Sequence, residues 1–169
     1  MTGAVEQTPP AWKRGKLSYG IGLTLHTANK MLEAGVIEAE KHGVPMAIAI
    51  SDAGGNLLAF NRMDNTMLVS IQIAIDKAFT AVFGKRPTEN WASSFREGPL
   101  IPLFVHERLI TFPGGFPIIS NGVLLGGVGA SGGVKYHDVH VARAALKAGG
   151  FSLDDADAAI ADLEDVGKE

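Results

Sequence analysis

The sequence predicts an α+β domain in which helices flank a five-stranded antiparallel sheet, in the order α-β-β-α-β-β-β-α. Its 169 residues are enough for one ordinary domain with its own core. Two pairs of expected strands are joined by turns too short to hold a crossover helix, so the sheet cannot be parallel throughout. Segments with helical periodicity lie before, between and after the strands. We therefore expect helices packed on an antiparallel sheet.

The first half of the chain supplies a helix and a hairpin. Thr24 can cap a helix that Gly43 stops. From Val44 to Asp52, large apolar residues alternate with alanine and serine, which predicts a strand with one bulky and one small face. A glycine-rich turn then leads into a second strand from Leu57 to Met63.

The second half supplies two further helices and three strands. Residues 65–83 predict a helix that is apolar on nearly every side and so buried at the centre of the fold. Leu109 to Phe112 predicts a short strand. Asn121-Gly122 between two apolar runs is typical of a type I′ hairpin. A final helix opens near His137 and closes at Gly149.

The domain is expected to occupy residues 21–150, with the two ends of the chain outside it. Residues 1–20 lack periodicity and predict an arm that is flexible or draped on a partner. Residues 151–169 hold seven acidic residues and one lysine, which favours a solvated acidic helix or tail.

Composition excludes several classes of protein. The chain has no cysteine, which excludes disulfides, thiolate nucleophiles and cysteine-ligated metal centres. A net charge of -3 gives no reason to expect a nucleic-acid partner. We expect no membrane span, since no run of about 20 apolar residues occurs. The N-terminus lacks the basic and apolar regions of a secretory signal, so cytoplasmic location is the default expectation.

Glycine is concentrated in one part of the chain. Eight glycines fall between residues 114 and 133. In the strand at 126–130 they indicate that something approaches the backbone closely: a flat ligand, another subunit, or a tightly packed helix. Ser131, Gly132 and Gly133 precede a helix and resemble a cradle for a carboxylate-sized anion.

Two cations are candidates for ligand binding. Arg62 can bind a carboxylate with its planar fork or pair with Asp64. Lys77 lies among apolar helix residues, where it must snorkel, pair with an acid or face a cavity; a buried lysine suits acid–base chemistry. We expect both to share a cavity beside the Ser131–Gly133 cradle, with Asp52, Asp64, Asp138 or an anionic ligand between them.

The histidines differ in what they can do. His26 stands near the start of the first helix, where the positive helix end favours a neutral imidazole that can ligate iron. His42 ends that helix and is interpreted as structural. His137 and His140 have a spacing that can hold a metal, but no third ligand is apparent, and solvation at a helix end is the simpler interpretation.

A series of short motifs runs from residue 43 to residue 138. It comprises GVPMAIAISDAGGNL at 43–57, RMD at 62–64, AIDKA at 74–78, GFPI at 115–118, GGVG at 126–129, and SGG at 131–133 with Asp138. Over roughly residues 22–150 these motifs resemble the GlcG-like, HbpS-type haem-binding family, whose module also forms the C-terminal domain of PduO-type cobalamin adenosyltransferases. The resemblance implies a five-stranded antiparallel sheet, dimers or larger oligomers, and functions from haem binding to isomerase-like roles.

Three functions are compatible with these residues. The first is a homo-oligomer that binds haem or another flat, carboxylate-bearing small molecule, with Arg62 and Lys77 at its carboxylates and His26 on the haem iron. The second is a cofactor-free tautomerase or isomerase of a small unsaturated carboxylic acid, in which Lys77 or His137 moves the proton. The third is a non-catalytic scaffold whose glycine-rich face is a subunit interface.

Overall fold

The structure is a computed structural model that describes residues 22–92, 106–152 and 154–155. The described part forms one four-stranded sheet in the order β2-β1-β4-β3, with antiparallel neighbours throughout. The strands are β1 (Ala47–Asp52), β2 (Leu57–Arg62), β3 (Gly115–Ser120) and β4 (Val123–Ser131). The helices are α1 (Leu25–His42), α2 (Leu68–Gly84), the 3-10 helix η1 (Thr88–Asn90) and α4 (Lys135–Ala148). The expected N-terminal arm and most of the acidic tail lie outside the described residues.

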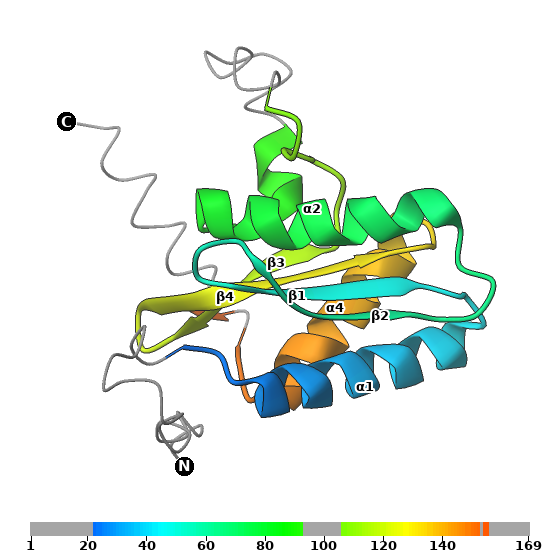
Figure 1. Ribbon diagram of the computed structural model, residues 1–169, viewed down its shortest axis with the longest axis horizontal. Coiled ribbons are helices and arrows are strands. Elements are labelled where there is room, and N and C mark those ends of the chain that lie inside the picture. The colour runs from blue at the N-terminus through cyan, green and yellow to red at the C-terminus, as the bar shows by residue number, and fades with distance from the viewer. Residues whose placement is uncertain (1–21, 93–105, 153, 156–169) are drawn as a thin grey trace, which may run out of the picture.

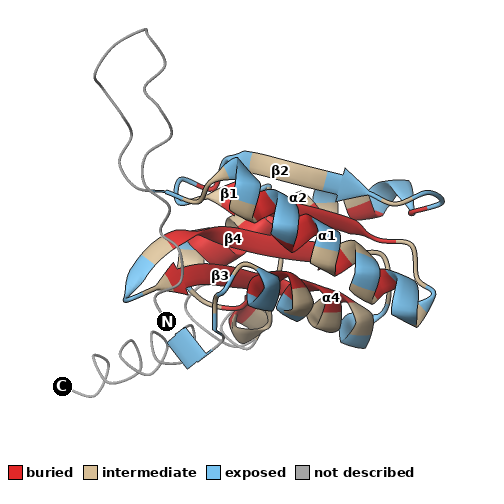
Figure 2. Cartoon of the chain, turned by 90° about the horizontal axis from the view of Figure 1, so that it is seen from below, coloured by how far each residue is buried: buried red, intermediate tan, exposed pale blue. Residues whose placement is uncertain are grey.

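The sheet is covered on both faces by helices. Helix α2 lies on one face, and α1 and α4 lie together on the other (Figure 1). Figure 2 shows β4 and β3 largely buried, whereas the edge strand β2 is partly exposed, with no buried residue. The α+β class and the antiparallel sheet predicted from the sequence are therefore confirmed.

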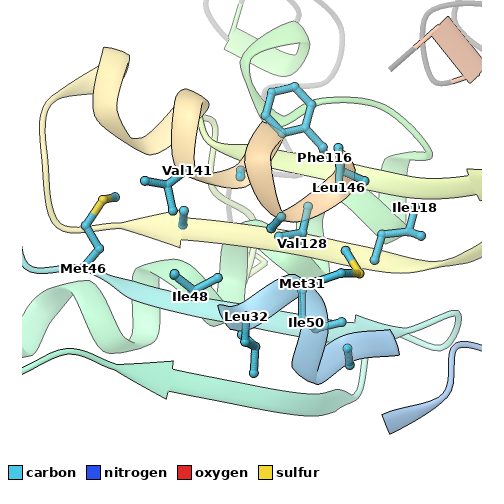
Figure 3. Packing of buried hydrophobic residues seen from close by; sticks show 14 of the residues in the cluster. Met31, Leu32, Met46, Ile48, Ile50, Phe116, Ile118, Val128, Val141 and Leu146 are labelled. Atoms are coloured by element: carbon cyan, nitrogen blue, oxygen red, sulfur yellow. The ribbon is translucent and has the colours of Figure 1, made fainter. Parts of the chain in front are cut away.

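The two faces of the sheet have different cores. Large side chains fill the face under α1 and α4, including Met31, Ile48, Ile50, Phe116 and Leu146 (Figure 3). The opposite face packs small residues of β1 against small residues of α2, namely Ala47, Ala49, Ala74 and Ala78. The bulky and small faces expected for the first strand are thus observed.

Local signals in the sequence placed the ends of several elements correctly. The Thr24 side chain caps α1 by accepting a hydrogen bond from the Thr27 N–H at 3.1 Å. Gly43 ends α1 in the left-handed conformation, with φ of 65°. Asn121 and Gly122 have φ of 50° and 74°, as a type I′ hairpin between β3 and β4 requires.

The prediction of five strands in the order α-β-β-α-β-β-β-α is wrong, because residues 109–112 are not a strand. Their backbone groups bind side chains of the neighbouring helices. The Ile110 N–H donates to the Thr80 hydroxyl at 3.1 Å, and the Thr88 hydroxyl donates to the Phe112 carbonyl at 2.6 Å. With those partners in α2 and η1, the segment has no need of a sheet neighbour.

Helix α2 is also less central than its composition predicts. It covers one face of the sheet, and part of its own outer side stays exposed within the described part of the chain. Leu68 and Val69 are 74% and 63% exposed, and Phe83 is 48% exposed. Its apolar character therefore reflects one buried face together with scattered exposed apolar residues.

The glycines of β4 are explained by the packing of α2. A Cβ atom on Gly129 would lie 2.1 Å from the Ala74 carbonyl oxygen, and one on Gly127 would lie 2.3 Å from the Ala78 carbonyl oxygen. Of the three explanations left open by the sequence, the tightly packed helix accounts for these two positions.

Candidate functional site

A buried ion pair lies where β4 ends and α4 begins. The Lys77 side chain, 1% exposed, donates to Asp138 Oδ2 at 2.6 Å and to the Ala130 carbonyl at 2.8 Å. The other Asp138 oxygen accepts a hydrogen bond from the Gly133 N–H at 3.1 Å. Of the three aspartates considered as partners of Lys77, the structure pairs it with Asp138, which lies 61 residues away.

Glycines make room for this pair. A Cβ on Gly114 would lie 2.7 Å from Asp138 Cβ, and one on Gly115 would lie 2.7 Å from the Lys77 carbonyl oxygen. Gly129 admits α2 close enough for Lys77 to reach the end of β4. The glycine-rich segment therefore positions the ion pair as well as the helix.

Burial dominates the electrostatics of the pair. It lowers the pKa of the Lys77 amine and raises the pKa of the Asp138 carboxyl, and the attraction between the two groups opposes both shifts. Each charge is therefore costly without the other. Since an ammonium group has three donors and two are used here, one N–H of Lys77 remains for an acceptor in the adjoining space.

That space is a cavity of about 270 Å³ beside Lys77. Its volume is slightly below the range typical of pockets for drug-sized ligands, so it suits a small anion better than a large planar group. The exposed apolar residues Met67, Val69 and Phe112 form part of its wall. The candidate residues that it brings together are Lys77, Ser131, Gly132, Gly133 and Asp138.

Two other candidates are not part of this cavity lining. Arg62 is exposed at the end of the edge strand β2, where it is paired with Ala47 in the sheet register. His137 packs against Gly133 from the side, since a Cβ on Gly133 would lie 2.6 Å from His137 Cβ and 2.8–3.0 Å from atoms of its imidazole. Of the two residues expected to move a proton in an isomerase, Lys77 lines the cavity and His137 does not.

A cluster of rings lies next to this cavity, where the end of α1 meets the start of α4. The His42 ring centroid is 5.3 Å from that of His137 and 5.8 Å from that of His140. The Tyr136 ring contacts that of His140 in a tilted arrangement, with centroids 4.0 Å apart. The cluster borders a second cavity of about 490 Å³, which is lined by Glu89, Val134, Lys135, Tyr136, Val139, His140 and Arg143.

Glu38 joins this cluster from α1. Its Oε1 lies 3.3 Å from His42 Nε2, and its Oε2 accepts a hydrogen bond from Lys41 at 2.8 Å. The hydrogen bond from Lys41 lowers the pKa of the Glu38 carboxyl. Glu38 is therefore ionised near neutral pH, and one of its oxygens faces the imidazoles.

His26 lies far from both features. It is exposed in the first turn of α1, 16 residues before His42, which corresponds to about 24 Å along the helix. Helix α4 runs antiparallel to α1, since its start contacts His42 and its end contacts Met31. His26 and the Lys77–Asp138 pair are thus at opposite ends of the molecule, and one ligand cannot contact both.

Comparison with known proteins places the chain in a family. The family model described as "Haem degrading protein HbpS-like" matches residues 23–147. The chain belongs to this HbpS-like family. Protein GlcG of Escherichia coli (strain K12) is 36% identical to it over 110 residues, which cover 64% of this chain and 81% of GlcG.

Two further relatives of this HbpS-like chain connect it with corrinoid and haem proteins. Corrinoid adenosyltransferase PduO of Citrobacter freundii is 34% identical over 131 residues, which cover 76% of this chain but only 39% of PduO. The crystal structure of a PduOC:haem complex has 31% identity and a TM-score of 0.72, covering 76% of this chain and 95% of that one. The resemblance read from the motifs is confirmed.

Two residues of this HbpS-like chain have neighbours that the sequence does not indicate. The sequence favours a structural role for His42 and gives none to Glu38, and the structure places both beside the imidazoles of α4. Their spacing of four residues on one helix was a usable signal, because it places both side chains on the same face. Their proximity to His140 depends on the packing of α1 against α4, which no local pattern encodes.

Proposed function

We propose that this HbpS-like chain binds haem as a homo-oligomer, with His26 as the axial ligand of the iron. The observation that carries the proposal is the family match together with its similarity to a protein crystallised with haem, at 31% identity and a TM-score of 0.72. Bound haem would supply a redox-active iron centre. The protein would supply the ligand, the counter-charge for the propionates and the cover that keeps water from the macrocycle.

The donor set of the described residues supports His26 for this role. His42, His137 and His140 have ring contacts with one another, and His106 stacks on Phe79 with centroids 5.6 Å apart. Within the described part of the chain, His26 has no such contact and projects from the exposed side of α1. Axial ligation uses one ring nitrogen, and the macrocycle needs open space in front of it, which the exposed His26 offers.

A second residue of α1 supports the same placement. Lys30, also exposed, follows His26 by four residues, so both side chains project from the same face of the helix. Its ammonium group can pair with a propionate while His26 binds the iron. Lys77 is not available for this role, because it is buried at the opposite end of the molecule and bound to Asp138.

If haem binds on the exposed face of α1, a second copy of the chain has a role in covering it. The exposed face of α1 can cover only one side of a macrocycle, and neither described cavity includes His26 in its lining. A second copy of the chain would cover the other side and exclude water from the iron. Haem binding and self-association are therefore expected to depend on each other.

The test is a titration of the full-length chain with hemin, followed by its Soret band. His26→Ala should shift or weaken the band, and His106→Ala, which removes another exposed imidazole, should leave it unchanged. If His140→Ala shifts the band and His26→Ala does not, haem binds in the cavity beside α4 and the His26 assignment is wrong. If the wild-type chain gives no band beyond that of free hemin, the haem proposal itself fails.

A further inference from the structure

Four side chains that can ligate metals meet where the end of α1 packs against the first turns of α4. Glu38 and His42 lie one turn apart on α1, and His137 and His140 lie on α4. One potential ligand atom each from Glu38, His42 and His140 lie within 4.8 Å of one another. Two helices distant in the sequence thus contribute to one cluster, in which α1 supplies two potential ligands beside His140 of α4.

Two of these imidazoles carry buried nitrogens without a hydrogen-bond partner among the described residues. They are His42 Nε2 and His137 Nδ1, on rings whose centroids are 5.3 Å apart. Glu38 Oε1 is 3.3 Å from His42 Nε2, but the two groups are not aligned as a hydrogen bond. Buried polar atoms nearly always have a partner, so this pair of nitrogens indicates an occupant of the space between the helices.

The carboxylate is oriented to receive such an occupant. Lys41 binds Oε2 of Glu38 at 2.8 Å, which leaves Oε1 directed at the imidazoles. The side chains of Glu38 and His42 are each 21% exposed, so they lie at the edge of the packed interior, although His42 Nε2 itself is buried. The cluster offers both nitrogen and oxygen ligands.

The donor set defines the class of ion. Two imidazoles and a carboxylate bind zinc and other divalent transition metals in sites that keep one position open, whereas Mg²⁺ and Ca²⁺ prefer oxygen ligands alone. Ligand atoms around a tetrahedral zinc ion stand about 3.3 Å apart. The Glu38–His42 contact, at 3.3 Å, already has this separation. The remaining separations, at most 4.8 Å, would close by small side-chain rotations.

We propose that Glu38, His42 and His140 bind one divalent transition-metal ion of the zinc class, with its open coordination position beside His137. The site lies about 24 Å along α1 from His26. It therefore uses none of the residues assigned to haem, and its test does not depend on haem binding.

The experiment is isothermal titration of the untagged, metal-stripped full-length chain with Zn²⁺. One ion per chain is expected for the wild type, and no binding is expected when Mg²⁺ replaces Zn²⁺. Glu38→Gln and His140→Ala should each weaken Zn²⁺ binding more than tenfold, because each removes a ligand. Glu38→Gln keeps the shape of the side chain, so its loss of binding cannot be ascribed to misfolding.

Two matched variants serve as controls. Glu40→Gln removes an exposed carboxylate from the same helix, and His106→Ala removes an exposed imidazole outside the cluster. Both should bind Zn²⁺ as the wild type does. The proposal is overturned if the wild type binds no Zn²⁺, if Glu38→Gln and His140→Ala bind it normally, or if the control variants lose it to the same extent.

Discussion

The two faces of the sheet reach a close-packed interior by opposite means. Under α1 and α4 the face is filled by long side chains such as Met31, Ile48 and Phe116 (Figure 3). Under α2 it is filled by the helix backbone itself, which lies against Gly127 and Gly129 of β4. Large side chains stabilise the first face, and the close approach of the α2 backbone to the sheet stabilises the second.

The difference also decides where polar groups can be buried. The α2 face holds Lys77, Thr80 and Ser51, each at most 2% exposed, and each bonds to a carbonyl or a carboxylate. Because α2 lies so close to the sheet, its side chains reach backbone groups that bulky residues would cover. On the α2 face, we therefore expect the unfolding free energy to fall when a polar partner is removed or an atom is added. On the face under α1 and α4, we expect it to fall when side-chain volume is removed.

The largest effect is expected from Lys77→Met. It leaves the Asp138 carboxylate buried without its cation, and breaking a buried pair in this way typically costs about 3–5 kcal/mol of unfolding free energy. Urea unfolding followed by circular dichroism measures the loss. Lys147→Met, which removes an exposed lysine from α4, should cost less than about 0.5 kcal/mol. Equal losses in the two variants would show that the ion pair is not a stabilising feature of this face.

The loss caused by Lys77→Met should depend on pH. Burial raises the pKa of Asp138, and removing Lys77 raises it further, since the Lys77 charge opposes that shift. The folded variant then holds a proton that the unfolded chain releases above about pH 3.9. Its unfolding free energy should fall, relative to the wild type, as pH rises from about 4 towards 7. A deficit that is the same at pH 4.5 and pH 7.5 would contradict this.

Gly129→Ala should have the next largest effect. The added Cβ would lie 2.1 Å from the Ala74 carbonyl and 2.6 Å from the Ala78 nitrogen, both of them backbone atoms of α2. Overpacking of this kind costs about 1–3 kcal/mol. Gly22→Ala is the matched control, because its Cβ would have no atom within 4 Å. If thermal unfolding shows the two variants to be equally stable, α2 is not held as closely as the structure indicates.

The smallest effect is expected on the bulky face. Ile50→Val removes one methylene from a side chain that is fully buried, which should cost about 0.5–1.5 kcal/mol. Ile37→Val makes the same change on α1 where the residue is 47% exposed, and should cost much less. Chemical denaturation of both variants measures these two losses of unfolding free energy. A larger loss for Ile50→Val would show that the cost comes from volume lost in the core, because both substitutions remove the same methylene.

Most of the secondary structure could be predicted from the sequence because its signals are local. The cap at Thr24, the stop at Gly43 and the Asn121-Gly122 turn each act within a few residues. The strand predicted at 109–112 is absent for the opposite reason. Its apolar residues resemble a strand, but its partners are the side chains of Thr80 and Thr88, which are distant in the sequence.

The candidate site shows the same limit. The apolar surroundings of Lys77 predict that it needs an acidic partner. Which aspartate becomes that partner depends on the fold, because the position of α4 brings Asp138, rather than Asp52 or Asp64, to Lys77. Glu38 and His42 could be placed on one helix face from their spacing. Only the antiparallel packing of α1 on α4 brings them to His140, and a single sequence does not encode that packing locally.

Haem binding is measured most directly by a hemin titration of the full-length wild-type protein. We expect a Soret band that sharpens on addition of hemin and saturates at a fixed ratio of no more than one haem per chain. A band that grows linearly without saturation, as it does when hemin is added to buffer alone, would contradict it.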